Sequence, residues 1–149
     1  MKIEDEIKGS FTNDYYKGLI NLMFTVKQLS YTFWQSLKKH GLTEPQYNIL
    51  KILRVHRAEC PFSIGFLKDR MLDKSSDVSR IVDKLYEKQY IDRKENSIDR
   101  RQKDVEITSK GLALLSGMED CEEKADTLLK NLTLEEVREL NRLLDKIRN

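Results

Sequence analysis

One long stripe of apolar side chains constrains the fold of this sequence more than any other feature. Within residues 11–37 apolar side chains recur in steps of three and four, which places them on one face of an α-helix. They are Phe11, Tyr15, Leu19, Leu22, Val26, Leu29, Phe33 and Leu37. An isolated helix cannot bury such a stripe, so we expect it to pack against further helices or a second subunit. Gly41 is expected to end the helix, because glycine suits the left-handed conformation of a helix C-terminus.

The next segment predicts two shorter helices. Thr43 and Gln46 have the spacing of a capping box, in which each residue caps the backbone of the other. A second helix is therefore expected to run to about His56. A connection that contains Pro61 follows, and a short helix begins at Ser63.

The segment after this short helix predicts a winged helix-turn-helix. The turn 73–76 is rich in capping residues and leads into a helix over residues 75–88. Beyond that helix the helical period is lost, and residues 90–94 and 105–108 are expected to pair as a β-hairpin with a charged tip. Two helices joined by a tight turn and followed by a hairpin are the elements of this motif.

Two helices are expected to close the chain. One follows Gly111 and runs to about Asn131, and the last begins at a capping box formed by Thr133 and Glu136. The expected fold is mostly α, an α+β winged helix of about six helices with a two-stranded β-hairpin wing. We expect a single domain over residues 1–149, a length that suits one hydrophobic core.

Composition narrows the functional classes. No apolar run is long enough to span a bilayer and the N-terminus has no signal-peptide core, so a cytoplasmic protein without membrane contact is expected. Cys60 and Cys121 lie far apart without a CxxC pair, which argues against a disulfide framework. With His40 and His56 as the only histidines, no metal site is expected. The chain has no glycine-rich phosphate loop and no nucleophile with an evident base, so we expect neither an enzyme nor a cofactor.

The helix over residues 75–88 carries the candidate DNA-binding residues. Val78, Ile81, Val82 and Leu85 define its buried face, and the polar side chains point away from that face. Small hydroxyls and an arginine suit a DNA major groove, where they reach phosphates and base edges. The alternative is an ordinary solvated helix face. The candidates on this helix are Ser75, Ser76, Ser79, Arg80 and Lys84.

The tip of the hairpin concentrates positive charge. Arg100, Arg101 and Lys103 are candidates for phosphate or minor-groove contacts, although a charged loop also serves solubility alone. Asp99 stands beside them and would repel DNA if it faced the phosphates. We expect it instead to pair with a nearby arginine and to structure the wing.

The ordered set of these motifs resembles the MarR family of transcriptional regulators. The resemblance rests on residues 42–46, 77–91, 99–101 and 107–111, which match the family's second helix, recognition helix, wing and wing exit in order. It implies a homodimer in which residues 11–38 and 112–149 form the dimerisation helices, while residues 42–111 form the DNA-binding region. It also implies that Asp99 and Arg101 occupy the wing aspartate and arginine positions.

Two positions depart from the family pattern. Gln89 stands where a glycine is common, at the end of the recognition helix. Asp77 suits the first turn of a helix but would repel phosphate if it faced DNA.

The expected function is that of a sequence-specific regulator of transcription that binds double-stranded DNA at a pseudo-palindromic operator. By family resemblance it is a repressor released by a small, often aromatic, effector; the alternative is a winged-helix module for protein or RNA contacts. Redox sensing is not favoured, because the first helix has no cysteine near its start. Candidates for an effector crevice are the aromatic residues Tyr15, Phe33, Trp34, Tyr47 and Phe62.

Overall fold

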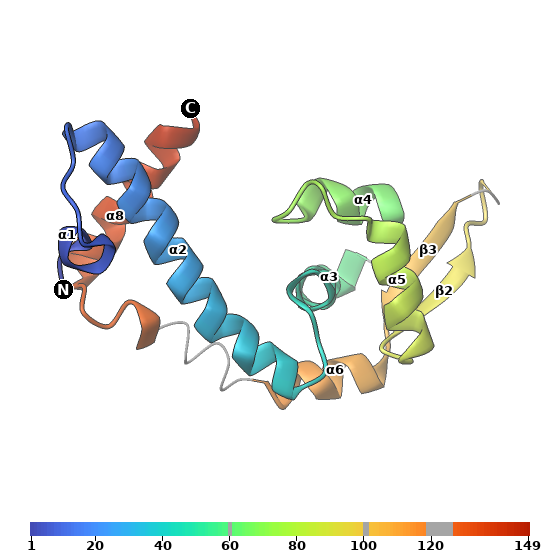
Figure 1. The fold of residues 1–149 in the computed structure, drawn as a ribbon. Coiled ribbons are helices and arrows are strands. Elements are labelled where there is room, and N and C mark those ends of the chain that lie inside the picture. The colour runs from blue at the N-terminus through green and yellow to red at the C-terminus, as the bar shows by residue number, and fades with distance from the viewer. Residues whose placement is uncertain (60, 100–101, 119–126) are drawn as a thin grey trace.

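The structure is a computed structural model that describes residues 1–59, 61–99, 102–118 and 127–149. A head built from residues 40–118 holds the hydrophobic core and the small β-sheet, and a long helix leads away from it (Figure 1). This helix, α2 (Asp14–Lys39), is the one predicted from the apolar stripe. The mostly helical winged-helix fold expected from the sequence is confirmed.

The first and last helices lie away from the head (Figure 1). The sequence analysis did not anticipate α1 (Ile3–Ile7), which an ion pair of 2.5 Å between Glu4 and Lys17 ties to α2. Hydrogen bonding between these two side chains lowers the pKa of Glu4 and raises that of Lys17. The last helix, α8 (Leu134–Arg148), opens with the predicted capping box.

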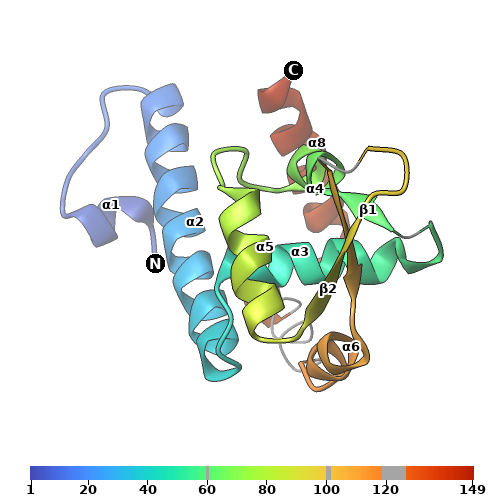
Figure 2. The same cartoon turned by 90° about the vertical axis from the view of Figure 1, so that its right-hand side faces the viewer.

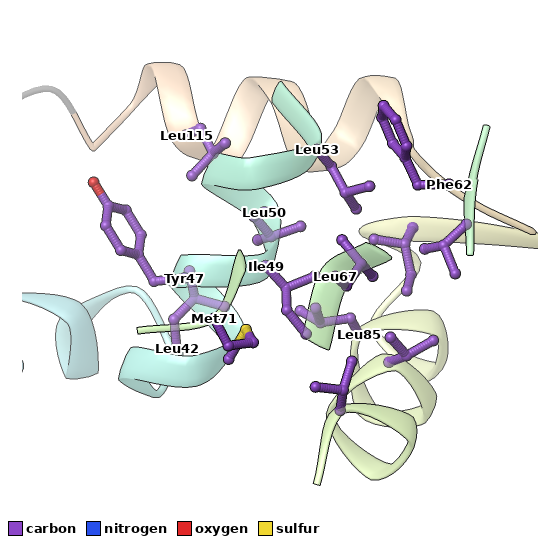
Figure 3. Close-up of a cluster of buried hydrophobic side chains, with 14 of the residues drawn as sticks. Leu42, Tyr47, Ile49, Leu50, Leu53, Phe62, Leu67, Met71, Leu85 and Leu115 are labelled. Carbon is purple, nitrogen blue, oxygen red and sulfur yellow. The ribbon is translucent and has the colours of Figure 1, made fainter. Parts of the chain in front are cut away.

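The core of the head forms around α3 (Glu44–Val55), which opens with the predicted capping box of Thr43 and Gln46. Leu50 and Leu53 are fully buried and face the other helices of the head (Figure 3). These are α4 (Ile64–Arg70), α5 (Val78–Glu87) and α6 (Ser109–Ser116), and a 3₁₀ turn, η1 (Arg57–Glu59), follows α3. α5 packs against α3 and α4, which fixes the position of the helix that we expect to contact DNA.

The expected hairpin is present and gains a third strand. β2 (Ile91–Glu95) and β3 (Lys103–Ile107) pair antiparallel, with Arg93 opposite Val105. The short strand β1 (Phe62–Ser63) pairs with the other edge of β3, which gives the order β1-β3-β2. Because β1 comes from the segment before α4, its pairing with Val105 and Asp104 anchors the middle of β3 to the head.

Three helix boundaries differ from the expected ones. α2 begins at Asp14, after its N-cap Asn13, so Phe11 of the apolar stripe lies before the helix. α5 begins at Val78 rather than at Ser75, because the side chain of Asp77 caps it by accepting from the amide of Arg80. The helix expected after Gly111 begins earlier, at Ser109, and its described part ends at Ser116 with Gly117 as C-cap.

Candidate nucleic-acid interface

α5 lies at the front of the head in Figure 2, and its polar side chains are exposed to solvent. Val78, Val82 and Leu85 are buried, as the helical period predicts. The opposite side is exposed and carries the predicted residues Ser79, Arg80 and Lys84 together with Asp83. Lys84 forms an ion pair with Glu87 at 2.9 Å, one turn further along the helix.

The two remaining serines of the candidate set lie in the turn before α5 rather than on the helix. The backbone amide and the hydroxyl of Ser75 both donate to a carboxylate oxygen of Asp73, at 2.9 and 2.6 Å. These hydrogen bonds lower the pKa of Asp73. Ser76 is half-buried in the same turn. The turn is thus held by its own hydrogen bonds, and the Ser75 hydroxyl is already engaged in one of them.

Asn96 organises the tip of the wing, a role that the sequence analysis missed. Its amide nitrogen donates to both carboxylate oxygens of Asp104, at 3.0 and 3.2 Å. Its side-chain oxygen accepts from the backbone amides of Ile98 and Asp99, both at 2.9 Å. An asparagine side chain that accepts from the backbone amide two residues on forms an Asx-turn. The Asn96-Ser97 pair at the start of the loop is the sequence signal that could have predicted this turn.

The other wing residues of the candidate set have distinct positions. Asp99 is half-buried and its carboxylate accepts from the side-chain amide of Gln102 at 3.3 Å. Lys103 is exposed at the start of β3. Arg100 and Arg101 lie outside the described residues, and so does any pairing of Asp99 with them.

A hollow of about 580 Å³ lies between α5 and the wing. It brings together Ser79 and Lys103, which the sequence proposed separately as DNA contacts from the helix and the hairpin. It also contains an ion pair that was not anticipated, between Arg93 of β2 and Asp83 of α5. The residues around it are Ser63, Ile64, Gly65, Ser79, Asp83, Arg93, Gln102 and Lys103.

Within one chain, the five aromatic residues proposed for an effector crevice lie in different places. Phe33 and Tyr47 contact edge to face with ring centroids 5.8 Å apart, and Tyr47 is buried in the core. Phe62 stacks on Phe66 of α4, with ring centroids 4.0 Å apart. Tyr15 is exposed near the start of α2.

Trp34 lines a second hollow, of about 480 Å³, where α2 meets the turn into α3. This volume is within the range of small-molecule sites. Apolar and aromatic side chains form most of the wall, and Lys38, Thr43 and Glu44 supply polar atoms. The lining residues are Trp34, Leu37, Lys38, Leu42, Thr43, Glu44 and Pro45.

Within the described residues, no group of three or more His, Cys, Asp or Glu side chains is placed to hold a metal ion. No helix in the described ranges is long and apolar enough to cross a bilayer. Cys60 and Cys121 lie outside these ranges.

Comparison with known proteins gives a consistent result. A model of the MarR family matches residues 42–103. The HTH-type transcriptional regulator MhqR of Bacillus subtilis is 32% identical over 113 residues, which cover 74% of this chain and 75% of MhqR.

Solved structures share the fold at low sequence identity. A mutant MarR from E. coli, complexed with operator DNA, superposes with a TM-score of 0.76 at 24% identity, over 93% of this chain and 99% of that one. BpsR of Bordetella bronchiseptica, whose DNA binding is regulated by 6-hydroxynicotinic acid, superposes with a TM-score of 0.77 at 21% identity, over 95% of this chain and 99% of that one.

Proposed function

Because the chain belongs to the MarR family of transcriptional regulators, we propose that it is a homodimeric repressor that binds a specific double-stranded operator and is released by a small aromatic effector. One observation carries the DNA-binding part of the proposal. On the exposed face of α5, Ser79 borders the same hollow as Lys103 of the wing, and Arg80 is exposed next to Ser79. A helix and a neighbouring hairpin that offer donors on one surface can contact a major groove and the adjacent backbone together.

Arg80 is the residue we assign to base recognition. It lies in the first turn of α5 and is exposed, and its guanidinium can donate two hydrogen bonds to the major-groove edge of a guanine. Ser79 and Lys103 are assigned to phosphates, with Ser75 and Ser76 at the edge of the contact surface. By family resemblance, Arg100 and Arg101 at the wing tip reach the adjacent minor groove.

Unburied apolar surface supports the homodimer. α8 contains no buried residue, although it carries apolar side chains at helical spacing, and Leu143 and Ile147 are exposed. Along α2 the residues Leu19, Met23 and Val26 are also exposed. Contiguous apolar faces of this kind mark interaction surfaces. A second copy that packs α2 and α8 against their counterparts covers both faces at once, as expected for a two-fold dimer.

The hollow beside Trp34 is the site we assign to the effector. Its apolar wall suits an aromatic ring, and Lys38 suits a carboxylate or phenolate on that ring. The hollow borders the turn that joins α2 to the head. A ligand there acts on DNA affinity only if it binds the DNA-competent and incompetent arrangements differently.

Selection of bound fragments from the source genome tests the DNA-binding proposal. We expect a pseudo-palindrome with half-sites about 10 base pairs apart, bound less tightly as salt rises. Arg80→Ala should weaken binding by about 10- to 100-fold. The matched control is Arg138→Ala, because Arg138 is exposed on α8, away from α5. A folded dimer that enriches no sequence would favour the alternative, a module for protein or RNA contacts.

Trp34 makes the effector proposal measurable, because it is the only tryptophan of the chain. Titration with 6-hydroxynicotinic acid and with other aromatic acids and phenols should change its fluorescence and lower operator affinity in parallel. Trp34→Ala should keep operator affinity and lose the response to the compound. If no compound changes the fluorescence of a chain that binds its operator, the effector assignment is wrong and the DNA-binding assignment stands.

A further inference from the structure

Arg93 joins the wing to α5. In β2 it lies opposite the buried Val105 and two residues after the buried Ile91, so it shares the side of the sheet that faces the head. From there its guanidinium forms an ion pair with the carboxylate of Asp83 and lies over the ring of Tyr86, 4.1 Å from the ring centroid.

The two α5 residues that Arg93 contacts are three positions apart, so both lie on the same side of that helix. The aromatic face orients the planar guanidinium, and the carboxylate receives its hydrogen bond. The arginine side chain is 23% exposed and that of Asp83 is 56% exposed. The cation is therefore the more buried partner, while the carboxylate is at the surface.

The position of Asp83 conflicts with DNA binding unless its charge is neutralised. It lies one turn after Ser79 and borders the same hollow as Ser79 and Lys103, the residues assigned to phosphates. A carboxylate on such a surface repels the phosphates of an approaching duplex. Within the described residues, Arg93 is the cation paired with it.

We infer that Arg93 is a positioning residue for DNA binding, which acts through Asp83. It turns the Asp83 carboxylate toward the wing and neutralises it there, so that Asp83 presents no unpaired negative charge to the hollow next to Ser79. The same contact fixes the distance between α5 and β2. This inference rests on the proposed DNA-binding function.

A suppression experiment with the full chain and its selected operator tests this role, with affinity measured by fluorescence anisotropy. Arg93→Gln should weaken binding by at least about 10-fold, because it exposes an unpaired carboxylate at the DNA surface. Asp83→Asn should remain within about threefold of the wild type. The double variant Arg93→Gln with Asp83→Asn should recover to within about threefold of the wild type, because no charge is left to neutralise.

Lys94→Gln is the matched control. Lys94 is the next residue of β2 and points to the other face of the sheet, where its side chain is 70% exposed and lies 3.7 Å from Glu106. The substitution Lys94→Gln removes one cation from the same strand and leaves the contact between Arg93 and α5 in place. We expect its affinity to stay within about threefold of the wild type. Thermal unfolding of each variant verifies folding, and Arg93→Lys, which keeps the charge but loses the planar fork, should bind with intermediate affinity.

Four results would overturn the inference. If the double variant is as weak as Arg93→Gln, Arg93 contacts phosphate itself or acts only on the fold. If Asp83→Asn alone weakens operator binding 10-fold but leaves random-sequence DNA unaffected, Asp83 contacts a base. If Arg93→Gln binds like Lys94→Gln, the ion pair has no role. A wild-type chain that binds no duplex refutes the DNA-binding function itself, and this role with it.

Discussion

Replacing Gly111 with alanine should destabilise the head by about 2–4 kcal/mol. Gly111 lies in the first turn of α6, where an added Cβ atom would lie 2.3 Å from the carbonyl oxygen of Tyr90 and 2.9 Å from Cγ1 of Ile107. A carbon–oxygen contact needs about 1 Å more than the first of these distances. The Tyr90 carbonyl cannot move away without loss of a hydrogen bond, because it accepts one from the backbone amide of Thr108 at 3.0 Å.

The magnitude combines two effects. Overpacking of a tight site costs about 1–3 kcal/mol, and loss of the hydrogen bond to Tyr90 adds about 1 kcal/mol. The smaller entropy of the unfolded alanine chain offsets less than about 1 kcal/mol of this. For a chain of this size the sum corresponds to a melting temperature lowered by about 5–15 °C.

Gly117→Ala is the matched control in the same helix. Its added Cβ atom would meet the backbone oxygens of Leu114 and Ala113 at 3.5 and 3.6 Å, which are ordinary contacts, and its φ of −74° suits alanine. We expect it to be neutral or to stabilise by up to about 1 kcal/mol. Both variants should be melted at one protomer concentration, because the proposed dimerisation would make the melting temperature depend on concentration. Equal melting temperatures for the two variants would refute the close approach of α6 to Tyr90.

The remaining predictions concern the dimer, a strained backbone position and the acid response. Ile147→Glu should weaken self-association, measured by sedimentation, at least about 10-fold, because it places a charge in the proposed interface. Val55→Glu is the control and should not weaken self-association, because Val55 is similarly exposed (71%, against 69% for Ile147) but lies on α3, outside that interface. Gln89→Gly should raise the free energy of unfolding by about 0.5 kcal/mol, because Gln89 has a φ of 63°; a lower urea midpoint would contradict this. Hydrogen bonds from Thr133 lower the pKa of Glu136 from 4.5, so the stabilisation they give is present above that value and is lost as the pH falls below it. Glu136→Gln should therefore make unfolding less sensitive to acid between about pH 5 and 3, and an unchanged acid response would argue against this cap.

The helices that could be predicted from sequence are those whose signals are local. The stripe that ends at Leu37 predicted α2, and capping boxes predicted the starts of α3 and α8, because a cap involves only residues three apart. The buried face of α5 followed from its period for the same reason. Short-range geometry is enough in each of these cases.

The start of α5 and the strand β1 depended on the rest of the fold. Ser75 and Asp77 are both acceptable caps, and the burial of Val78 selects the second, since the helix must begin where its apolar face meets the core. Phe62 and Ser63 form a strand because β3 offers a free edge there, with Val105 opposite Phe62. A strand of two residues has no period of its own, so no local pattern predicts it.

The candidate site also contains residues whose position can be predicted from local sequence and one whose role depends on the rest of the fold. Arg80 and Lys103 could be proposed as exposed cations because their own neighbours suggest it, whereas Arg93 acquires its role from Asp83, ten positions earlier on another element. An arginine in a short strand next to an exposed carboxylate on a helix has no sequence signature without the pairing of the two elements. The register of β2 with β3 decides which face of the sheet Arg93 occupies, and a shift of one residue would turn Lys94 toward α5 in its place.

The turn between α2 and α3 shows how such long-range contacts connect the two proposed sites. Lys88, at the end of α5, donates to the backbone carbonyl of Gly41 at 2.6 Å and lies 3.5 Å from the side-chain oxygen of Gln46. The hollow beside Trp34 is walled by the next residues of the same turn, including Leu42. A ligand in that hollow and the C-terminus of α5 would therefore contact one short segment from two sides. If such a ligand moved this segment, it would move α5 through Lys88, and we expect this route to couple the proposed effector site to the proposed DNA-binding face.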